Sequence, residues 1–171
     1  MTTNGKSLHI HLDLVGGIAG DMFVASMLDM DRDKESDLTS SVLEATNYVL
    51  PDSAGNAQVY EGLNSGISGL RFKLQKLNHS KSSAHTLDNH SHHDHHHTSY
   101  KHLCNRLAGS SLRPALTNIA IQILTIIAKA EAKVHGTSIE DVHFHELADW
   151  DSLMDVVASA VILDRYQNTS W

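Results

Sequence analysis

The side chains best suited to chemistry in this sequence are imidazoles and carboxylates, and the densest group lies between residues 90 and 97. Neutral imidazole is a good ligand for nickel, copper, zinc and cobalt, so this group predicts affinity for a divalent transition metal. A loose loop suits the capture or buffering of metal better than catalysis, which needs fixed geometry. The candidate metal ligands of this loop and its C-terminal flank are His90, His92, His93, His95, His96, His97 and His102.

A second group combines two histidines with carboxylates: His143, His145, Glu146, Asp149, Asp151 and Asp155. Residues two apart in an extended segment point the same way, so His143 and His145 could bind one ion. Asp151 and Asp155 are four apart on a predicted helix and share a face of it. No histidine stands three residues after Glu146, which disfavours a metalloprotease. The structural alternative is that an aspartate caps the helix while one histidine packs in the core.

A glycine-rich turn follows Asp13 and ends at Asp21. Gly17 and Gly20 could bring backbone N–H groups close to a phosphate, which makes them, with Asp21, candidate cofactor-binding residues. The spacing fits neither the Rossmann fingerprint nor the Walker A loop. The alternative is a tight turn with Asp21 as a helix N-cap. Asp13 ends a predicted strand, and such a strand end is a common place for a ligand carboxylate.

These residues need a scaffold, and hydrophobic periodicity predicts a mixed α+β (α/β-class) fold in a single domain over residues 1–171. Alternation predicts a strand over 8–14 and a β-hairpin of 57–63 with 70–77, joined by the turn 64–69. Helical spacing predicts helices from about residue 21, over 38–48, from Pro114 to Gly136, and over 152–166. We expect the small sheet of one strand plus the hairpin to pack against these helices. Residues 78–100 are predicted to form a long histidine-rich loop.

Composition and charge exclude several classes of protein. The formal charge of −7 has the wrong sign for a nucleic-acid surface. The single cysteine, Cys104, excludes a disulfide framework and a thiolate-rich zinc site made by this chain alone. The N-terminus shows no secretory signal, and the most apolar window, 119–132, is interrupted by charged and amide side chains. We therefore expect a soluble, cytoplasmic protein that binds neither nucleic acid nor membrane.

Several motifs, taken in their order along the chain, resemble one family. They are Leu12-Asp13, the stretches 17–23, 66–69, 130–136 and 142–146, and Asp151-Ser152 with Asp155. The ordered set, with a histidine-rich loop between the second and third stretches, resembles the nickel-insertion proteins of nickel-pincer cofactor synthesis. These are the pyridinium-3,5-bisthiocarboxylic acid mononucleotide nickel chelatases of lactate racemase maturation.

The resemblance implies a CTP-dependent, lyase-type nickel chelatase that makes one nickel–carbon and two nickel–sulfur bonds on the pyridinium mononucleotide. CTP would bind with a divalent ion. Loss of a ring proton requires a base, for which His143, His145 and Glu146 are candidates; Asp13 and Asp151 complete the predicted catalytic set. The family continues into a C-terminal nucleotide-binding portion, so we expect that portion, or a separate chain carrying it, as a partner. A homo-oligomer is also compatible with the sequence.

Two other functions fit part of the sequence. A non-enzymatic nickel chaperone or metal buffer would need only the histidine-rich loop. A zinc-dependent hydrolase would use His143, His145 and an aspartate, with an open coordination position for an activated water.

Overall fold

The computed structural model describes residues 8–33, 37–76, 98–144 and 150–171. In these ranges the chain forms five α-helices, two short 3-10 helices and four strands, which confirms the predicted mixed α+β class. The elements are, in order, α1 (Gly20–Asp31), α2 (Leu38–Asn47), η1 (Asp52–Ala54), β1 (Asn56–Asn64), β2 (Ile67–Gln75), β3 (Thr98–Ser99), α3 (Tyr100–Ala108), α4 (Pro114–His135), η2 (Ile139–Asp141), β4 (His143–Phe144) and α5 (Trp150–Arg165).

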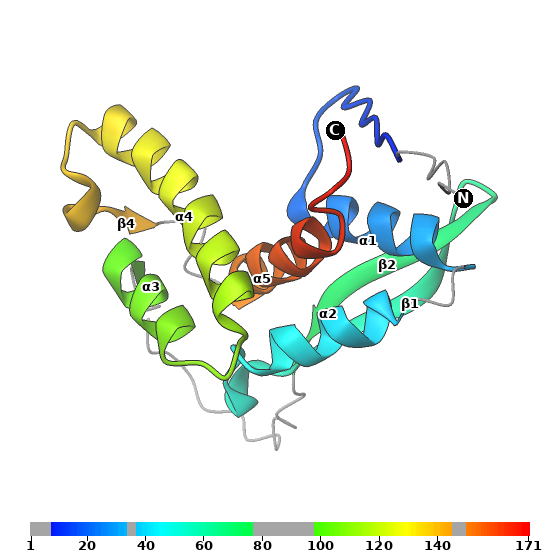
Figure 1. Ribbon diagram of the computed structural model, residues 1–171, viewed down its shortest axis with the longest axis horizontal. Helices are drawn as coiled ribbons and strands as arrows, with labels where there is room; N and C mark the ends of the chain where they lie inside the picture. The colour runs from blue at the N-terminus through cyan, green and yellow to red at the C-terminus, as the bar shows by residue number, and fades with distance from the viewer. Residues whose placement is uncertain (1–7, 34–36, 77–97, 145–149) are drawn as a thin grey trace, which may run out of the picture.

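Helix α5 is the centre of the molecule, with α4 on one side and α1 and α2 on the other (Figure 1). It is apolar over most of its circumference, and Leu153, Met154, Val157 and Ile162 are almost completely buried. A helix with buried residues on so many faces must be covered by several neighbours. Its contacts with α1, α2, α4 and β2 provide that cover and fix the direction in which its polar first turns point.

The predicted hairpin is confirmed, with a tighter turn than the sequence suggested. β1 and β2 pair antiparallel from Asn56 opposite Gln75 to Asn64 opposite Ile67. The two turn residues, Ser65 and Gly66, both have positive φ (50° and 83°), as a type I′ turn requires. Because side chains alternate along a strand, Phe72 and Leu74 are buried while their neighbours on β2 are exposed.

Helix α4 confirms the predicted start at Pro114 and stop at Gly136, whose φ of 64° is the left-handed conformation of a glycine C-cap. Leu116, Ala120, Leu124 and Ala128 form its buried stripe, four residues apart. By length and composition alone this 22-residue helix could cross a membrane. It packs on α3 and α5 through that stripe, and only 22% of its most apolar window is buried.

Two expectations about the N-terminal region are wrong. The predicted strand over 8–14 is reduced to a single parallel bridge between His9 and Ser170, and within the described ranges it joins neither two-stranded sheet. It bonds to the C-terminal residues at Leu8 and Ile10, with Ile10 N–H donating to the Ser170 carbonyl at 2.9 Å and Ser170 N–H to the Leu8 carbonyl at 3.3 Å. Asp21 is not the N-cap, because α1 begins at Gly20 with Ala19 as the cap and Asp21 in the first turn.

The other predicted helices are confirmed to within two residues at each end, as α2 and α5. Helix α3 is not predicted by the sequence periodicity. It begins at Tyr100, which is the last residue of the predicted histidine-rich loop. Residues 78–97 of that loop lie outside the described residues. The predicted extended piece near residue 143 is β4, which pairs with β3.

Candidate functional site

The site is built around Asp155, which lies against the first turn of α1. Gly20 opens that helix, and a Cβ at this position would lie 2.6 Å from Asp155 Oδ2 and 2.7 Å from Asp155 Cβ. Only glycine therefore allows the carboxylate to come this close. The backbone N–H of Asp21 donates a hydrogen bond to it. The carboxyl group of Asp155 thus accepts from the N-terminus of α1 and takes the place that we expected a phosphate to occupy.

The surroundings of Asp155 favour its protonated form. Burial raises the pKa of its carboxyl group to about 7, with smaller contributions from the negative charges of Asp151 and Asp21; the Asp21 N–H acts in the opposite direction. Asp155 Oδ1 is buried and has no hydrogen-bond partner among the described residues. A carboxyl group that changes charge near pH 7 can accept or release a proton under physiological conditions.

Three carboxylates, Asp21, Asp151 and Asp155, are thus near one another where α1 and α5 begin. Asp151 and Asp155 are one turn apart on α5, and both Asp21 and Asp151 are exposed. The start of α5 is held by Trp150, whose ring lies 4.5 Å below the Arg106 guanidinium of α3. In the described part of the chain, no three histidine, cysteine or acidic side chains are arranged as a ready metal site. The three carboxylates therefore form an acidic cluster and not a preformed metal site. A bound ion would have to bring their oxygens closer together.

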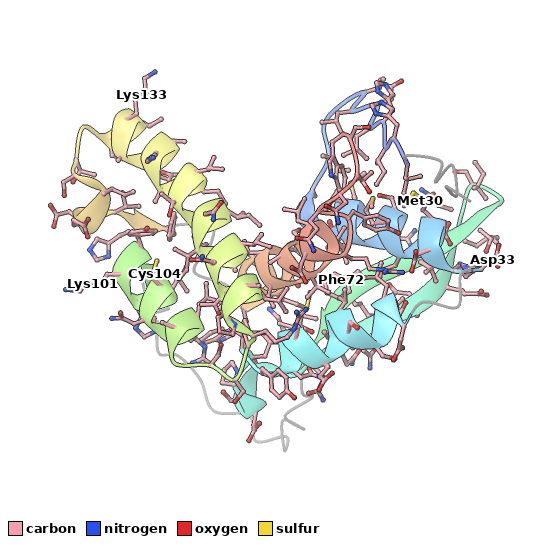
Figure 2. All side chains as sticks on the ribbon, viewed as in Figure 1. Met30, Asp33, Phe72, Lys101, Cys104 and Lys133 are labelled. Carbon is pink, nitrogen blue, oxygen red and sulfur yellow. The ribbon has the colours of Figure 1, made fainter. Side chains whose placement is uncertain are left out.

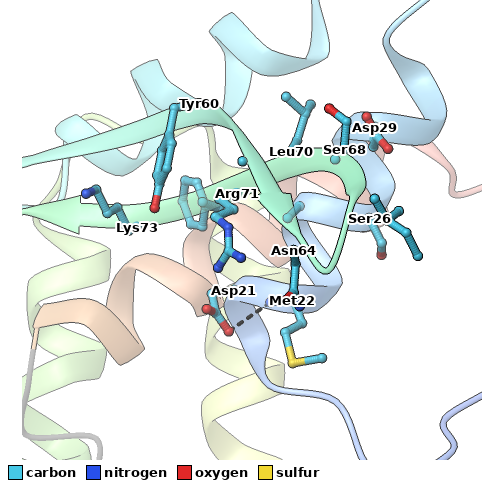
Figure 3. Close-up of a pocket in the computed structure, with 15 residues that line it drawn as sticks. Asp21, Met22, Ser26, Asp29, Tyr60, Asn64, Ser68, Leu70, Arg71 and Lys73 are labelled. Carbon is cyan, nitrogen blue, oxygen red and sulfur yellow. Dashed lines mark hydrogen bonds between the residues drawn. The ribbon is translucent and has the colours of Figure 1, made fainter.

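Asp21 also lines a pocket of about 610 Å³ between α1 and the hairpin (Figure 3). This volume is in the range of about 300–1,000 Å³ that is usual for small-molecule sites. Met22, Ala25 and Ser26 of α1 line one side, while the hairpin contributes polar and aromatic side chains on the other. The residues of the hairpin side include Tyr60, Asn64, Ser68, Arg71 and Lys73. The pocket therefore connects the acidic cluster, through Asp21, with a basic wall.

The predicted histidine ligands that the structure describes lie in a different region. His143 is exposed on β4, directly opposite Ser99 of β3. His102 is exposed in the first turn of α3, where its backbone N–H donates to Ser99 Oγ at 3.2 Å. Both are therefore neighbours of Ser99. Figure 1 shows β4 beside α3 and α4, on the other side of α5 from the hairpin.

The remaining predicted residues divide into exposed ones and ones that the structure does not describe. Asp13 is exposed before the turn in which Gly17 N–H donates to the Leu14 carbonyl at 3.0 Å. Gly16 and Gly17 have φ of 82° and 93°, and added side chains would meet open space. The predicted ligands and catalytic residues outside the described ranges are His90, His92, His93, His95, His96, His97, His145 and Glu146.

The only cysteine is poorly suited to metal binding. Burial raises the pKa of the Cys104 thiol, although a hydrogen bond with Tyr100 acts in the opposite direction. Because the thiolate, not the thiol, is the metal ligand, this favours oxygen and imidazole ligands over sulfur from this chain.

Three residues of the pocket wall were missed from the sequence: Tyr60, Arg71 and Lys73. Alternation along 70–77 places Arg71 and Lys73 on one face of the strand, so the sequence alone could have predicted this pair of cations. Tyr60 lies opposite Arg71 because of the register of the hairpin. The two-residue turn fixes that register, and the sequence suggested a longer turn. The spacing of Asp151 and Asp155 predicts that they share a helix face, but the contact of Asp155 with Gly20 joins residues far apart in the sequence.

Known proteins resemble this chain over nearly its whole length. Residues 10–170 match the family described as nickel insertion protein. The pyridinium-3,5-bisthiocarboxylic acid mononucleotide nickel insertion protein of Geobacillus kaustophilus is 33% identical over 154 residues, which cover 90% of this chain and 35% of the relative. Proteins of the same name from Akkermansia muciniphila and Staphylococcus saprophyticus are each 30% identical, over 89% and 95% of this chain. The chain spans only 34% to 35% of the length of these relatives. No solved structure matches it significantly.

Proposed function

Because this chain belongs to the nickel insertion protein family, we propose that it takes part in inserting Ni²⁺ into pyridinium-3,5-bisthiocarboxylic acid mononucleotide. The observation that carries the proposal is a pocket of the volume usual for small-molecule sites, which the Asp21 carboxylate of the acidic cluster lines. The acidic end attracts a divalent cation, and the pocket accepts the organic substrate beside it.

Asp21 and Asp151 are the proposed nickel ligands of this centre. They are exposed, so an arriving ion can reach them, and both lie close enough to influence Asp155. Carboxylate oxygen is a harder ligand than sulfur, so nickel held in this way passes readily to the two thiocarboxylate sulfurs of the substrate. The direction of transfer thus follows from ligand preference.

Asp155 is the proposed base. The nickel–carbon bond forms at the ring carbon between the two thiocarboxylates; its C–H bond breaks, the electron pair goes to nickel, and the proton must go to a nearby base. Burial and like charges raise the pKa of Asp155 to about 7. The positive charge of arriving nickel lowers that pKa again, so the carboxylate is ionised when the proton must be accepted. His145 and Glu146, which precede α5 in the sequence, remain candidates for the same task.

His102 and His143 are proposed to receive nickel before it reaches the carboxylates. Both are neighbours of Ser99, and the histidine-rich run 90–97 ends one residue before β3. Imidazoles on exposed positions exchange nickel without needing a rigid cage. The second candidate function, a non-enzymatic nickel buffer, rests on the histidine-rich run 90–97 alone.

The relatives are about three times as long as this chain, so we propose that turnover requires a further portion of such a protein. CTP with a divalent ion would be used there. The chain described here would contribute the nickel centre and the substrate pocket.

The proposal is tested by mixing the chain with purified pyridinium substrate, Ni²⁺ and CTP, with and without the remaining two-thirds of a relative. Mass spectrometry should detect the substrate with nickel added and one ring proton lost. A variant that lacks residues 78–97 separates the two functions, because an insertion protein keeps tight nickel binding and a buffer loses it. If no nickelated product forms in any mixture, the insertion function is wrong.

A further inference from the structure

The hairpin presents two cations to the pocket, Arg71 and Lys73, on the same face of β2. Figure 3 shows the Arg71 side chain extending from β2 towards the start of α1, where Asp21 lies. Gly62 of β1 makes this possible, since a Cβ there would lie 2.4 Å from Arg71 Nε and 2.7 Å from its Cδ. The absence of a side chain at Gly62 therefore leaves the space that the Arg71 side chain occupies.

The acidic residues around these cations do not hold them in ion pairs. The other two carboxylates near this side of the pocket, Asp29 and Glu61, both pair with Arg32, at 2.7 Å and 3.0 Å. Within the described ranges neither Arg71 nor Lys73 makes an ion pair with a carboxylate. In a chain of net charge −7, two such cations side by side in a pocket point to an anionic ligand.

Tyr60 adds a flat wall next to the two cations. It lies opposite Arg71 in the hairpin register, and the Lys73 ammonium lies 4.7 Å from the centre of its ring. Arginine presents several N–H donors in a fork that matches phosphate, and lysine adds a mobile point charge. Asn64 and Ser68 on the same side can add hydrogen bonds to phosphate or ribose oxygens.

We propose that Arg71 and Lys73 bind the phosphate monoester of the mononucleotide substrate and so direct its pyridinium ring towards Asp21. This inference rests on the proposed function and names the substrate group that the hairpin side of the pocket holds. The carboxylate of Asp155 already occupies the start of α1, so a phosphate there would be repelled. The cations of the hairpin wall and the carboxylates at the start of α1 thus favour one orientation of the substrate.

The orientation has a chemical consequence. With the phosphate at Arg71 and Lys73, the two thiocarboxylates lie at the acidic end, where they would be repelled unless nickel is bound between them and the carboxylates. Nickel therefore makes the productive complex favourable, and the substrate without nickel is held mainly by its phosphate.

The test uses nicotinic acid mononucleotide as the probe and its riboside, which lacks the phosphate, as the comparison. Calorimetric titration of the chain should show the riboside binding at least about 10-fold more weakly, as expected for loss of a charge-assisted contact. Arg71→Gln and Lys73→Gln should each weaken mononucleotide binding about 10-fold and leave riboside binding unchanged. Lys101→Gln, an exposed lysine on α3 away from the pocket (Figure 2), is the matched control and should bind as the wild type does. Unfolding midpoints confirm that the variants are folded.

The outcomes separate this inference from the proposed function. Equal binding of mononucleotide and riboside, no binding of either, or unchanged mononucleotide binding in both variants would overturn the phosphate assignment. CTP is the second probe. If the wild type binds CTP but not the mononucleotide, and both variants no longer bind CTP, then the two cations bind the triphosphate and the inference is wrong. A phosphate preference that depends on Arg71 and Lys73, with no nickelation in any mixture, would support the phosphate site and overturn the insertion function alone.

Discussion

Replacing Asp155 with asparagine should stabilise the metal-free protein at pH 8. Burial, Asp151 and Asp21 raise the pKa of Asp155 from 3.8 to about 7, so ionising this group costs more in the folded than in the unfolded chain. At the full shift the penalty would be about 4 kcal/mol. Because Asp155 is only partly buried, solvent screening lowers the expected gain in Asp155→Asn to about 1–2 kcal/mol. Asparagine keeps an oxygen that can accept the Asp21 N–H.

The gain should depend on pH in a defined direction. Below about pH 4 the wild-type carboxyl is protonated in both states, so the two proteins should be about equally stable. As pH rises from about 4 to 7 only the unfolded chain ionises, and the wild type loses stability relative to the variant. Above about 7 the folded state ionises as well and the difference stays constant.

Urea unfolding of wild type and Asp155→Asn at several pH values between 4 and 8 measures this difference, with Asp52→Asn as a control at an exposed site. The reasoning is refuted if the variant is no more stable than wild type at pH 8, or if the difference between them does not change with pH.

Three further outcomes follow from the geometry. Gly20→Ala should destabilise the fold by about 1–3 kcal/mol, because the new Cβ would overlap Asp155; Gly69→Ala, which has room for a Cβ, should be close to neutral in the same urea experiment. Gly66→Ala should cost about 1 kcal/mol because φ is 83° there, and calorimetry should show a lowered melting temperature. Nickel at about 100 times its dissociation constant should stabilise the chain by about 2.7 kcal/mol, and chelation should reverse this; a melting temperature unaffected by nickel would contradict specific binding to the folded state.

Local signals in the sequence were sufficient for the elements that are stabilised locally. Pro114 and Gly136 marked the ends of α4, and alternation on both sides of Ser65 and Gly66 marked the hairpin. The segment 8–14 also alternates, yet a strand needs a partner edge, and its neighbours supply only the bridge at Ser170. Periodicity alone does not contain that information.

The candidate site was only partly predictable for the same reason. Asp151 and Asp155 could be placed on one face of a helix from their spacing. The approach of Asp155 to Gly20 depends on how α5 packs on α1, over a separation of more than a hundred residues in the sequence. Asp21 was identified as a candidate, but its role as the link between the acidic cluster and the pocket depends on the hairpin, which lies on its other side.

The central claim is that nickel binds the carboxylates at the start of α1 and α5, and nickel titration of a variant lacking residues 78–97 tests it most directly. We expect one retained site, weakened at least about 10-fold by Asp151→Asn and unchanged by Asp164→Asn, whose carboxylate near the other end of α5 pairs with Arg113. If the retained site is insensitive to Asp151→Asn and is lost in His143→Ala, nickel binds at β4 and the acidic cluster is not the nickel centre.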